Sequence, residues 1–379
     1  MMSLRSIREL VESIRPRYLR ADKKEKKRIL DEFVATTRYH RKHAIRLLNH
    51  GYKAKGIKKP GRQKIYTGAV VEALKMIWEL CGRICSKRLH PYLPEIVGVL
   101  ERHNELHLSP EEKGLLLQMS RATIDRCLLP ARFEKPRGIS TTKPGPLLKK
   151  AIPVRTWAQW DDARPGFVEI DLLAHCGNSV EGQYLNTLTA VDVSTGWTEC
   201  LAIFQKTQFA VFEAIQELRR RLPFPLLGID SDNGTEFINE LLYRYCMQEQ
   251  ITFTRSRPYK KNDQAHVEQK NWSIVRRTIG YDRFETQSEL ALLRRIYQDL
   301  RLYTNFFQPV LKLIGKVQVD GKLIKQHDTA STPFRRVLAA EQVSLEVKTN
   351  LMNSFVQLNP VTLRNSIDHQ VGILWKIIR

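Results

Sequence analysis

Residues 229–237 read IDSDNGTEF and follow the apolar run PLLG at 225–228. The apolar run predicts a buried strand, and Asn233-Gly234 predicts a sharp turn directly after it. Asp230 and Asp232 therefore stand where a strand leaves its sheet. A lone aspartate before a turn usually accepts a hydrogen bond within that turn. A catalytic role for these acids is therefore indicated only if the fold places other acids beside them.

The segments around this strand predict a mixed α/β domain at residues 158–307. FVEIDLLAH at 167–175 alternates apolar and acidic residues like a half-buried strand. YLNTLTAVD at 184–192 and GWTECLAIF at 196–204 predict two more strands. The remaining pattern predicts helices at 207–222, 236–248, 263–279 and 286–303, and strands at 224–231 and 251–256. The order β-β-β-α-β-α-β-α predicts a mixed five-stranded sheet.

The charge of the chain is strongly basic and unevenly distributed. The 379 residues carry a net charge of +22, and residues 1–157 hold 35 of the 62 basic and 15 of the 40 acidic residues. The net charge is thus +20 in this part and +2 in the remainder. Such asymmetry predicts that the N-terminal part binds a polyanion, most simply nucleic acid; a basic solubilising region is the alternative.

The composition also indicates the cellular compartment in which we expect the protein. No apolar run approaches the ~20 residues of a membrane span, and the first residues lack the pattern of a signal peptide. The six cysteines show no disulfide framework, so we expect a bacterial cytoplasmic protein associated with the nucleoid. Cys81 and Cys85 could join histidines in a zinc site, but they fall in an apparent buried helix at 70–85, which favours buried thiols.

The first helices suggest a DNA-binding unit at residues 1–66. A helix is predicted at 24–35 and a second at 38–49, with Thr37 as its N-cap. Two short helices joined by a tight turn, the second of them basic, form the helix-turn-helix pattern. The alternative is an ordinary helical hairpin with a solvated basic face.

Three further segments complete the organisation. Residues 67–131 predict a second helical domain resembling a helix-turn-helix, with helix starts at Pro110 and after Ser120. Residues 132–157, rich in proline and basic residues, predict an extended linker. Residues 308–379 predict a small C-terminal module with an Asp-Gly hairpin at 316–325 and helices at 332–340 and 344–375, the last broken at Asn359-Pro360.

Three acids stand out in the α/β domain. Asp171 lies in its first strand, Asp232 follows its fourth strand, and Glu268 lies on the helix after its fifth, with 35 residues between Asp232 and Glu268. This spacing, with the motifs FVEIDLLAHCG, SDNGTEF and RPYKKNDQAHVEQKN, resembles the catalytic core of retroviral integrases and bacterial insertion-sequence transposases. The helical N-terminal part resembles the transposase branch. The resemblance implies an RNase H-like core in which the three acids are catalytic and bind the metal.

The chemistry supplies independent reasons for such a triad. Two Mg²⁺ or Mn²⁺ ions ~3.5–4 Å apart can activate the attacking oxygen and stabilise the leaving oxygen in phosphodiester cleavage. Magnesium prefers hard oxygen ligands and keeps several waters. Clustered carboxylates repel one another unless a cation neutralises them. Asp230 competes with Asp232 for the second position, Glu169 shares the face of Asp171, and His175 has no assigned role.

These observations predict a metal-dependent transposase that acts on double-stranded DNA, both at element ends and at the target. We expect a homo-oligomer, because two ends must be held together. Two alternatives remain: a DNA-binding regulator whose core no longer cuts, and a nuclease that acts on RNA. The residues predicted to contact DNA share a basic side chain in a helix or loop: Arg38, Arg41, Lys42, Arg46, Lys58, Lys59, Arg62, Arg121, Arg126, Arg257, Lys260, Lys261 and Lys270.

Overall fold

A computed structural model gives the fold of the chain. It describes residues 2–52, 65–132, 164–232, 234, 236–237, 239–255, 264–319 and 322–378. The chain divides into two compact units, Met1–Ile65 and Tyr66–Arg379. The linker predicted at 132–157 lies outside the described residues except for Arg132.

The first unit contains three helices, α1 (Leu4–Arg20), α2 (Lys23–Thr37) and α3 (Arg41–His50). Val11, Phe33 and Leu48 are almost fully buried among them. Ser3 and Asp22 cap the first two helices, each through a side-chain oxygen that accepts a backbone N–H. The helical pair predicted from the sequence is thus present and packs against a third helix.

The turn between α2 and α3 differs from the prediction. Thr37 is not an N-cap: it is the last residue of α2, and its hydroxyl donates to the carbonyl oxygen of Phe33 at 2.7 Å. Arg38 then adopts a left-handed conformation with φ +58°, and His40 caps α3 by accepting the Lys42 N–H. The sequence alone could not reveal this shift, because threonine bonds equally well to the preceding turn of its own helix.

The second unit begins with four helices, α4 (Ala69–Leu80), α5 (Ser86–Arg102), α6 (Pro110–Leu117) and α7 (Arg121–Arg132). Ser109 forms a capping box with Glu112, and the Ser120 hydroxyl accepts the Thr123 N–H, which confirms both predicted helix starts. The predicted helix at 70–85 ends earlier, at Leu80. Cys81 is buried, but Cys85 is exposed, so the prediction of two buried thiols is wrong for Cys85.

The mixed five-stranded sheet predicted from the sequence is confirmed. Its strands are β1 (Phe167–Ala174), β2 (Asn186–Asp192), β3 (Thr198–Ile203), β4 (Gly228–Ser231) and β5 (Thr252–Arg255), in the spatial order β3-β2-β1-β4-β5. β1 and β3 run antiparallel to β2, whereas β4 is parallel to both β1 and β5. This order and these directions define an RNase H-like core.

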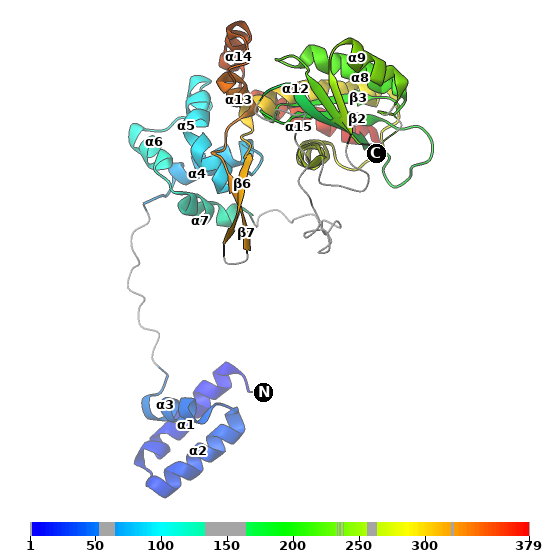
Figure 1. Cartoon of the computed structure of the whole chain (residues 1–379). Coiled ribbons are helices and arrows are strands. Elements are labelled where there is room, and N and C mark those ends of the chain that lie inside the picture. The colour runs from blue at the N-terminus through cyan, green and yellow to red at the C-terminus, as the bar shows by residue number, and fades with distance from the viewer. Residues whose placement is uncertain are drawn as a thin grey trace. The chain divides into compact units, whose positions relative to one another are not determined.

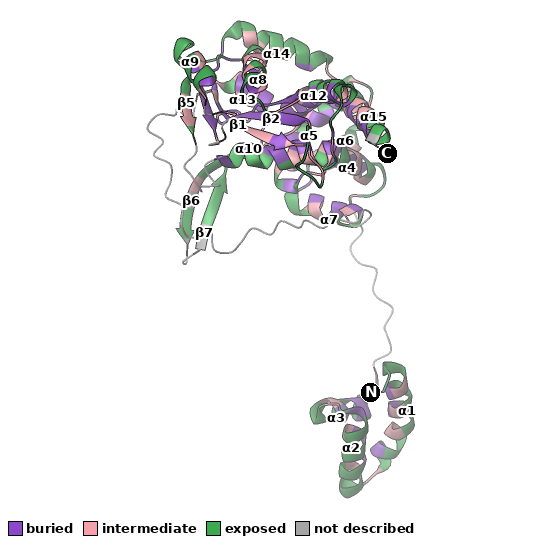
Figure 2. Cartoon of the chain, turned by 90° about the vertical axis from the view of Figure 1, so that its right-hand side faces the viewer, coloured by how far each residue is buried: buried purple, intermediate pink, exposed green. Residues whose placement is uncertain are grey.

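Helices cover both faces of the sheet. One face packs against α8 (Gln208–Arg221) and α9 (Glu240–Gln248), which lie on the same side of the strands (Figure 1). The other face packs against α12 (Gln287–Phe307), α15 (Pro360–Ile378) and the helix that carries Glu268. Two-sided cover explains why every residue of β2 and β3 is buried, and β2 is coloured as buried in Figure 2.

The helix predicted at 263–279 is not a uniform α-helix. It consists of α10 (Ala265–Lys270), a π-helix η3 (Asn271–Arg276) and the short α11 (Arg277–Ile279). The helix predicted at 236–248 begins later, at Glu240, where the Asn239 side chain accepts the Leu242 N–H. π-helical turns are rare and often occur at functional sites.

The C-terminal residues contribute to both neighbouring cores. The predicted hairpin is present as β6 (Leu313–Val319) and β7 (Lys322–His327), followed by α13 (Pro333–Ala339), α14 (Leu345–Gln357) and α15. Phe334 and Phe355 pack with α4–α7, whereas Leu374 of α15 packs under the sheet. In the described part of the chain, no helix is both long and apolar enough to cross a membrane.

Candidate active site

Asp171 lies near the middle of β1, opposite Thr189 of β2. One carboxylate oxygen, Oδ1, accepts the N–H of Leu172 at 2.8 Å. The other, Oδ2, accepts the side-chain amide of Asn271 at 2.7 Å. Because Asn271 opens the π-helix, this bond ties the strand directly to the helix that carries Glu268.

Asp230 and Asp232 have different surroundings. Asp230 lies inside β4, is 3% exposed and accepts a hydrogen bond from the Thr254 hydroxyl at 2.7 Å. Asp232 lies just past the strand, is half-buried, and accepts the Gly234 N–H at 2.9 Å. The buried and bonded Asp230 fits a structural role, whereas Asp232 remains accessible to a ligand, as the sequence interpretation requires.

Two buried side chains anchor the helix of Glu268 to the sheet. Glu169, 1% exposed on β1, accepts the backbone N–H groups of His266 and Val267 at 3.0 and 3.1 Å. The Gln264 amide lies 3.4 and 3.3 Å from the carbonyl oxygens of Ile170 and Asp230. A carboxylate at a helix N-terminus satisfies donors that have no partner within the helix, so Glu169 fixes where α10 starts.

Glu268 is exposed on α10 and directly follows the anchored Val267. Figure 2 shows exposed surface along α10. The sequence interpretation noted that Glu169 shares the face of Asp171 but assigned it no task, and it did not single out Gln264. The alternation of FVEID was the available signal, since it puts both acids on one face of the strand.

The three acids interact electrostatically. The pKa of Asp171 is raised to about 6, first by burial and then by the negative charges of Asp232 and Glu268. The hydrogen bonds from the Leu172 N–H and the Asn271 amide oppose this rise. Asp171 thus stands in an electrostatic field that disfavours its charged form, and a nearby cation would reverse that effect.

The side chains fit a divalent metal in their chemistry. Within the described ranges, no three histidine, cysteine or acidic side chains are already arranged to hold an ion. The three acids nevertheless offer carboxylate oxygens, which Mg²⁺ and Mn²⁺ prefer as ligands. The buried Oδ1 of Asn271, beside Asp171, has no hydrogen-bond partner among the described residues. Asp171, Asp232 and Glu268 are the residues that would hold the ion.

His175 has a structural environment. It is fully buried, and its Nε2 lies 2.8 Å from the Thr187 hydroxyl, which in turn bonds the Tyr297 hydroxyl at 2.6 Å. Burial, and secondarily the charge of Arg276, lowers the pKa of His175 to about 3. The imidazole is therefore neutral in the folded protein at physiological pH, and it packs edge-on against Phe284.

This burial predicts a pH-dependent contribution to stability. An unfolded histidine titrates near 6.5, so the contribution of His175 is complete above pH 6.5 and is lost as pH falls towards 3, by an amount on the order of a few kcal/mol. Asp171 and Asp192, with pKa values raised to about 6, act in the opposite sense. The quantity to measure is the difference in melting temperature between wild type and His175→Gln from pH 7 to 5.

We expect this difference to change over that range, with the wild type losing stability relative to the variant as pH falls. His369→Gln is the matched control, because His369 is exposed on α15. A wild type and a His175→Gln variant with parallel curves would contradict the neutral, buried state of His175.

The basic residues predicted to contact DNA fall into distinct groups. Arg38, Arg41, Lys42 and Arg46 are exposed at or near α3, but Arg41 is paired with Asp31. Arg121 and Arg126 are exposed on α7. The remaining loop residues lie outside the described parts of the chain: Lys58, Lys59, Arg62, Arg257, Lys260 and Lys261.

Lys270 requires a correction. The prediction of a DNA contact is wrong because Lys270 is only 9% exposed and faces inwards. Burial, and next the nearby charge of Arg88, lowers its pKa to about 8. The sequence suggested a DNA contact because Lys270 flanks Glu268 on the same helix, but residues two apart on a helix point in different directions.

Comparisons with known proteins add the following. No family model matches the chain. The catalytic core domain of BIV integrase is 20% identical, covers 46% of this chain and 95% of its own, and has a TM-score of 0.33. The HTLV-2 integrase catalytic core domain in complex with magnesium, in a dimeric form, is 16% identical over 42% of this chain and 93% of its own, with a TM-score of 0.29. The strand order, and not these similarities, defines the fold.

A full-length relative matches far more of the chain. The "Uncharacterized protein y4rM" of Sinorhizobium fredii is 42% identical over 337 residues. The match covers 88% of this chain and 96% of the relative, so it extends well beyond the sheet. The chain therefore belongs to the same family as protein y4rM of Sinorhizobium fredii.

Proposed function

We propose that this protein is a DNA transposase, which binds the ends of a mobile element and catalyses metal-dependent cleavage and joining of DNA strands. One observation carries the proposal: the Asn271 amide, at the start of the π-helix that follows Glu268, donates a hydrogen bond to Asp171 at 2.7 Å. Asp232 lies just past β4, the parallel neighbour of the strand of Asp171, so the three acids come from adjoining elements although they are remote in the sequence. Holding like-charged carboxylates close together costs free energy unless a cation neutralises them. A metal site therefore accounts for acids at a strand end and on an anchored helix.

Each residue of the site has its own role in the proposed reaction. Asp171, Asp232 and Glu268 hold the metal, and Asn271 orients Asp171 through its amide. Glu169 keeps α10, and with it Glu268, in register with β1. When bound, two Mg²⁺ or Mn²⁺ ions supply Lewis-acid stabilisation of the attacking and leaving oxygens. No nucleophilic side chain is needed, because water attacks in cleavage and a DNA 3′-hydroxyl attacks in joining.

The test is metal-dependent nicking of DNA. The substrate is a duplex that contains the sequences flanking the coding region, where inverted repeats mark the ends of a mobile element. We expect a strand cut at the repeat boundary with Mg²⁺ or Mn²⁺ and none with a chelator. Binding without cutting would favour a regulator instead, and preferential cutting of an RNA–DNA hybrid would favour a nuclease that acts on RNA.

The first unit is the proposed reader of element ends. Lys42 and Arg46 are exposed on α3, which corresponds to the recognition helix of a helix-turn-helix. Changing both residues to alanine should weaken binding of the end duplex by the full-length protein. Each lost phosphate contact lowers the slope of log affinity against log salt by about 1, so we expect a decrease of about 2. Fluorescence anisotropy over a salt series measures this slope.

The matched control removes the same charge from α2. Lys24 and Lys27 are also exposed, and their replacement by alanine should leave the slope nearly unchanged. Equal losses for both double variants would show that overall charge, and not α3, holds the DNA. Because two ends must be brought together, we further expect a homo-oligomer on DNA.

A further inference from the structure

A tryptophan is exposed beside the acidic site. Trp272 lies on the π-helix and has 56% of its surface exposed. It follows Glu268 by four residues, which is about 6 Å along a helix axis. Its neighbour in sequence, Asn271, bonds Asp171. The residues that face the core from this helix form a separate stripe: Val267, Lys270, Asn271, Ile274 and Val275.

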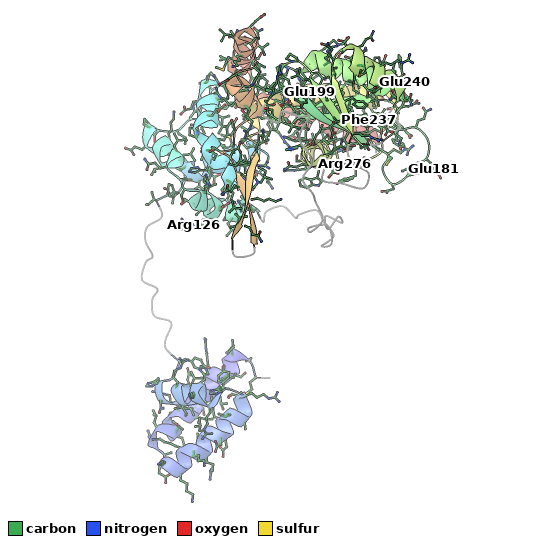
Figure 3. The ribbon with its side chains drawn as sticks, in the orientation of Figure 1. Arg126, Glu181, Glu199, Phe237, Glu240 and Arg276 are labelled. Atoms are coloured by element: carbon green, nitrogen blue, oxygen red, sulfur yellow. The ribbon has the colours of Figure 1, made fainter. Side chains whose placement is uncertain are left out.

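The surroundings of Trp272 are cationic. The Arg277 guanidinium lies 6.0 Å from the centroid of the Trp272 ring. One turn of π-helix brings residues five apart to the same side, which explains this contact. At the far end of the helix, where Figure 3 labels Arg276, that guanidinium lies 4.6 Å from the ring of Tyr281, which is 64% exposed. Arg276 is only partly exposed and also donates to the carbonyl oxygens of Ala174 and Gly280, so Trp272 with Arg277 is the more exposed aromatic and cationic pair.

Arg277 also borders a polar cleft. The cleft has a volume of about 180 Å³, and Arg83, Arg364 and Thr278 contribute to its lining. Arg83 and Arg364 pair with carboxylates, whereas Arg277 donates to the carbonyl oxygen of Gly82 at 3.0 Å. Guanidinium and hydroxyl groups in such a cleft suit a phosphate oxygen.

We propose that Trp272 is a stacking platform for an unpaired nucleobase of the DNA held at the acidic site, with Arg277 on the adjoining phosphate. This proposal rests on the proposed function and names the form of DNA that the site accepts. A protein partner would require a wider apolar patch, but the exposed residues about one turn before and after Trp272 on its own helix, Gln269 and Arg277, are polar and charged. A single exposed ring flanked by cations instead matches a strand that alternates flat bases with anionic phosphates. Inside a duplex both faces of a base are covered, so the base must be unpaired.

The test compares two single-stranded probes with the full-length protein. One is a fluorescein-labelled oligo(dT), and the other is an abasic deoxyribose-phosphate strand of equal length. Both carry the same charge, so the basic N-terminal part should attract both strands equally. The ratio of their affinities therefore reports the contribution of the bases alone. Removal of one base-stacking ring corresponds to a loss of roughly ten-fold. We therefore expect Trp272→Ala to lower the preference for oligo(dT) by about ten-fold and Trp272→Phe to retain most of it.

Phe209→Ala is the matched control, since Phe209 is 62% exposed on α8, against the other face of the sheet. It should leave the ratio unchanged, and circular dichroism should show that every variant is folded. The proposal is overturned if the wild type does not prefer oligo(dT), or if Trp272→Ala keeps that preference. Nicking of the end duplex is measured separately: its absence alongside a Trp272-dependent preference refutes the proposed function and not the base contact.

Discussion

Replacing Asp232 by asparagine should yield a protein that folds and binds end DNA but cuts and joins it at least about 10³-fold more slowly. The reason is the loss of one charged metal ligand, and metal ions contribute several kcal/mol of transition-state stabilisation, at about 1.4 kcal/mol per factor of ten in rate. Folding should be intact because Asp232 is half-buried past the end of β4 and its Oδ1 accepts the N–H of Gly234 in the turn. Single-turnover nicking and gel-shift assays measure the two properties separately.

Asp230→Asn is the matched control, because Asp230 is the competing acid two residues earlier. It is buried against Thr254, so its loss should lower thermal stability more than the nicking rate. Full nicking by Asp232→Asn, or inactivity of Asp230→Asn with an unchanged melting temperature, would transfer the catalytic role to Asp230. The same comparison in Mg²⁺ and Mn²⁺ would show whether the loss follows the metal.

Much of the fold was predictable because buried apolar residues recur in the sequence with the period of the helix or strand that carries them. The alternation in FVEIDLLAH and the apolar run before IDSD predicted β1 and β4, and the order of strands and helices along the chain predicted a mixed sheet. Helix starts with a capping side chain, such as that of Ser109, were also predictable. Thr37 failed as a predictor, because its hydroxyl can serve the helix before it as well as the helix after it.

The acids of the candidate site were predictable from the sequence, but the contacts that position them were not. Carboxylates at a strand end and on a later helix are visible as residue types at a spacing. The anchoring of α10 by Glu169 depends on where the backbone N–H groups of His266 and Val267 meet β1, a contact about a hundred residues apart in the chain. The π-helix is equally invisible, because it arises from packing.

Truncating Glu169 to alanine should both destabilise the protein and slow nicking. The change leaves two buried N–H groups at the start of α10 without their acceptor, and a buried donor without a partner costs about 1–3 kcal/mol. For a unit of this size we expect a fall of several degrees in melting temperature. Nicking should slow further than stability explains, by on the order of 10²-fold, because a displacement of about 1 Å at Glu268 disturbs the metal geometry.

Two other variants separate the loss of the acceptor oxygen at residue 169 from the loss of an acidic charge. Glu169→Gln keeps an oxygen at the same place, so it should retain most of the stability and more of the activity than alanine does. Glu240→Ala removes an exposed acid on α9 (Figure 3), whose ion pair with Arg244 is a surface pair of small worth. It should behave as wild type. If Glu169→Ala melts and nicks as the wild type does, the position of Glu268 does not depend on this anchor, and α10 must be held by its apolar contacts alone.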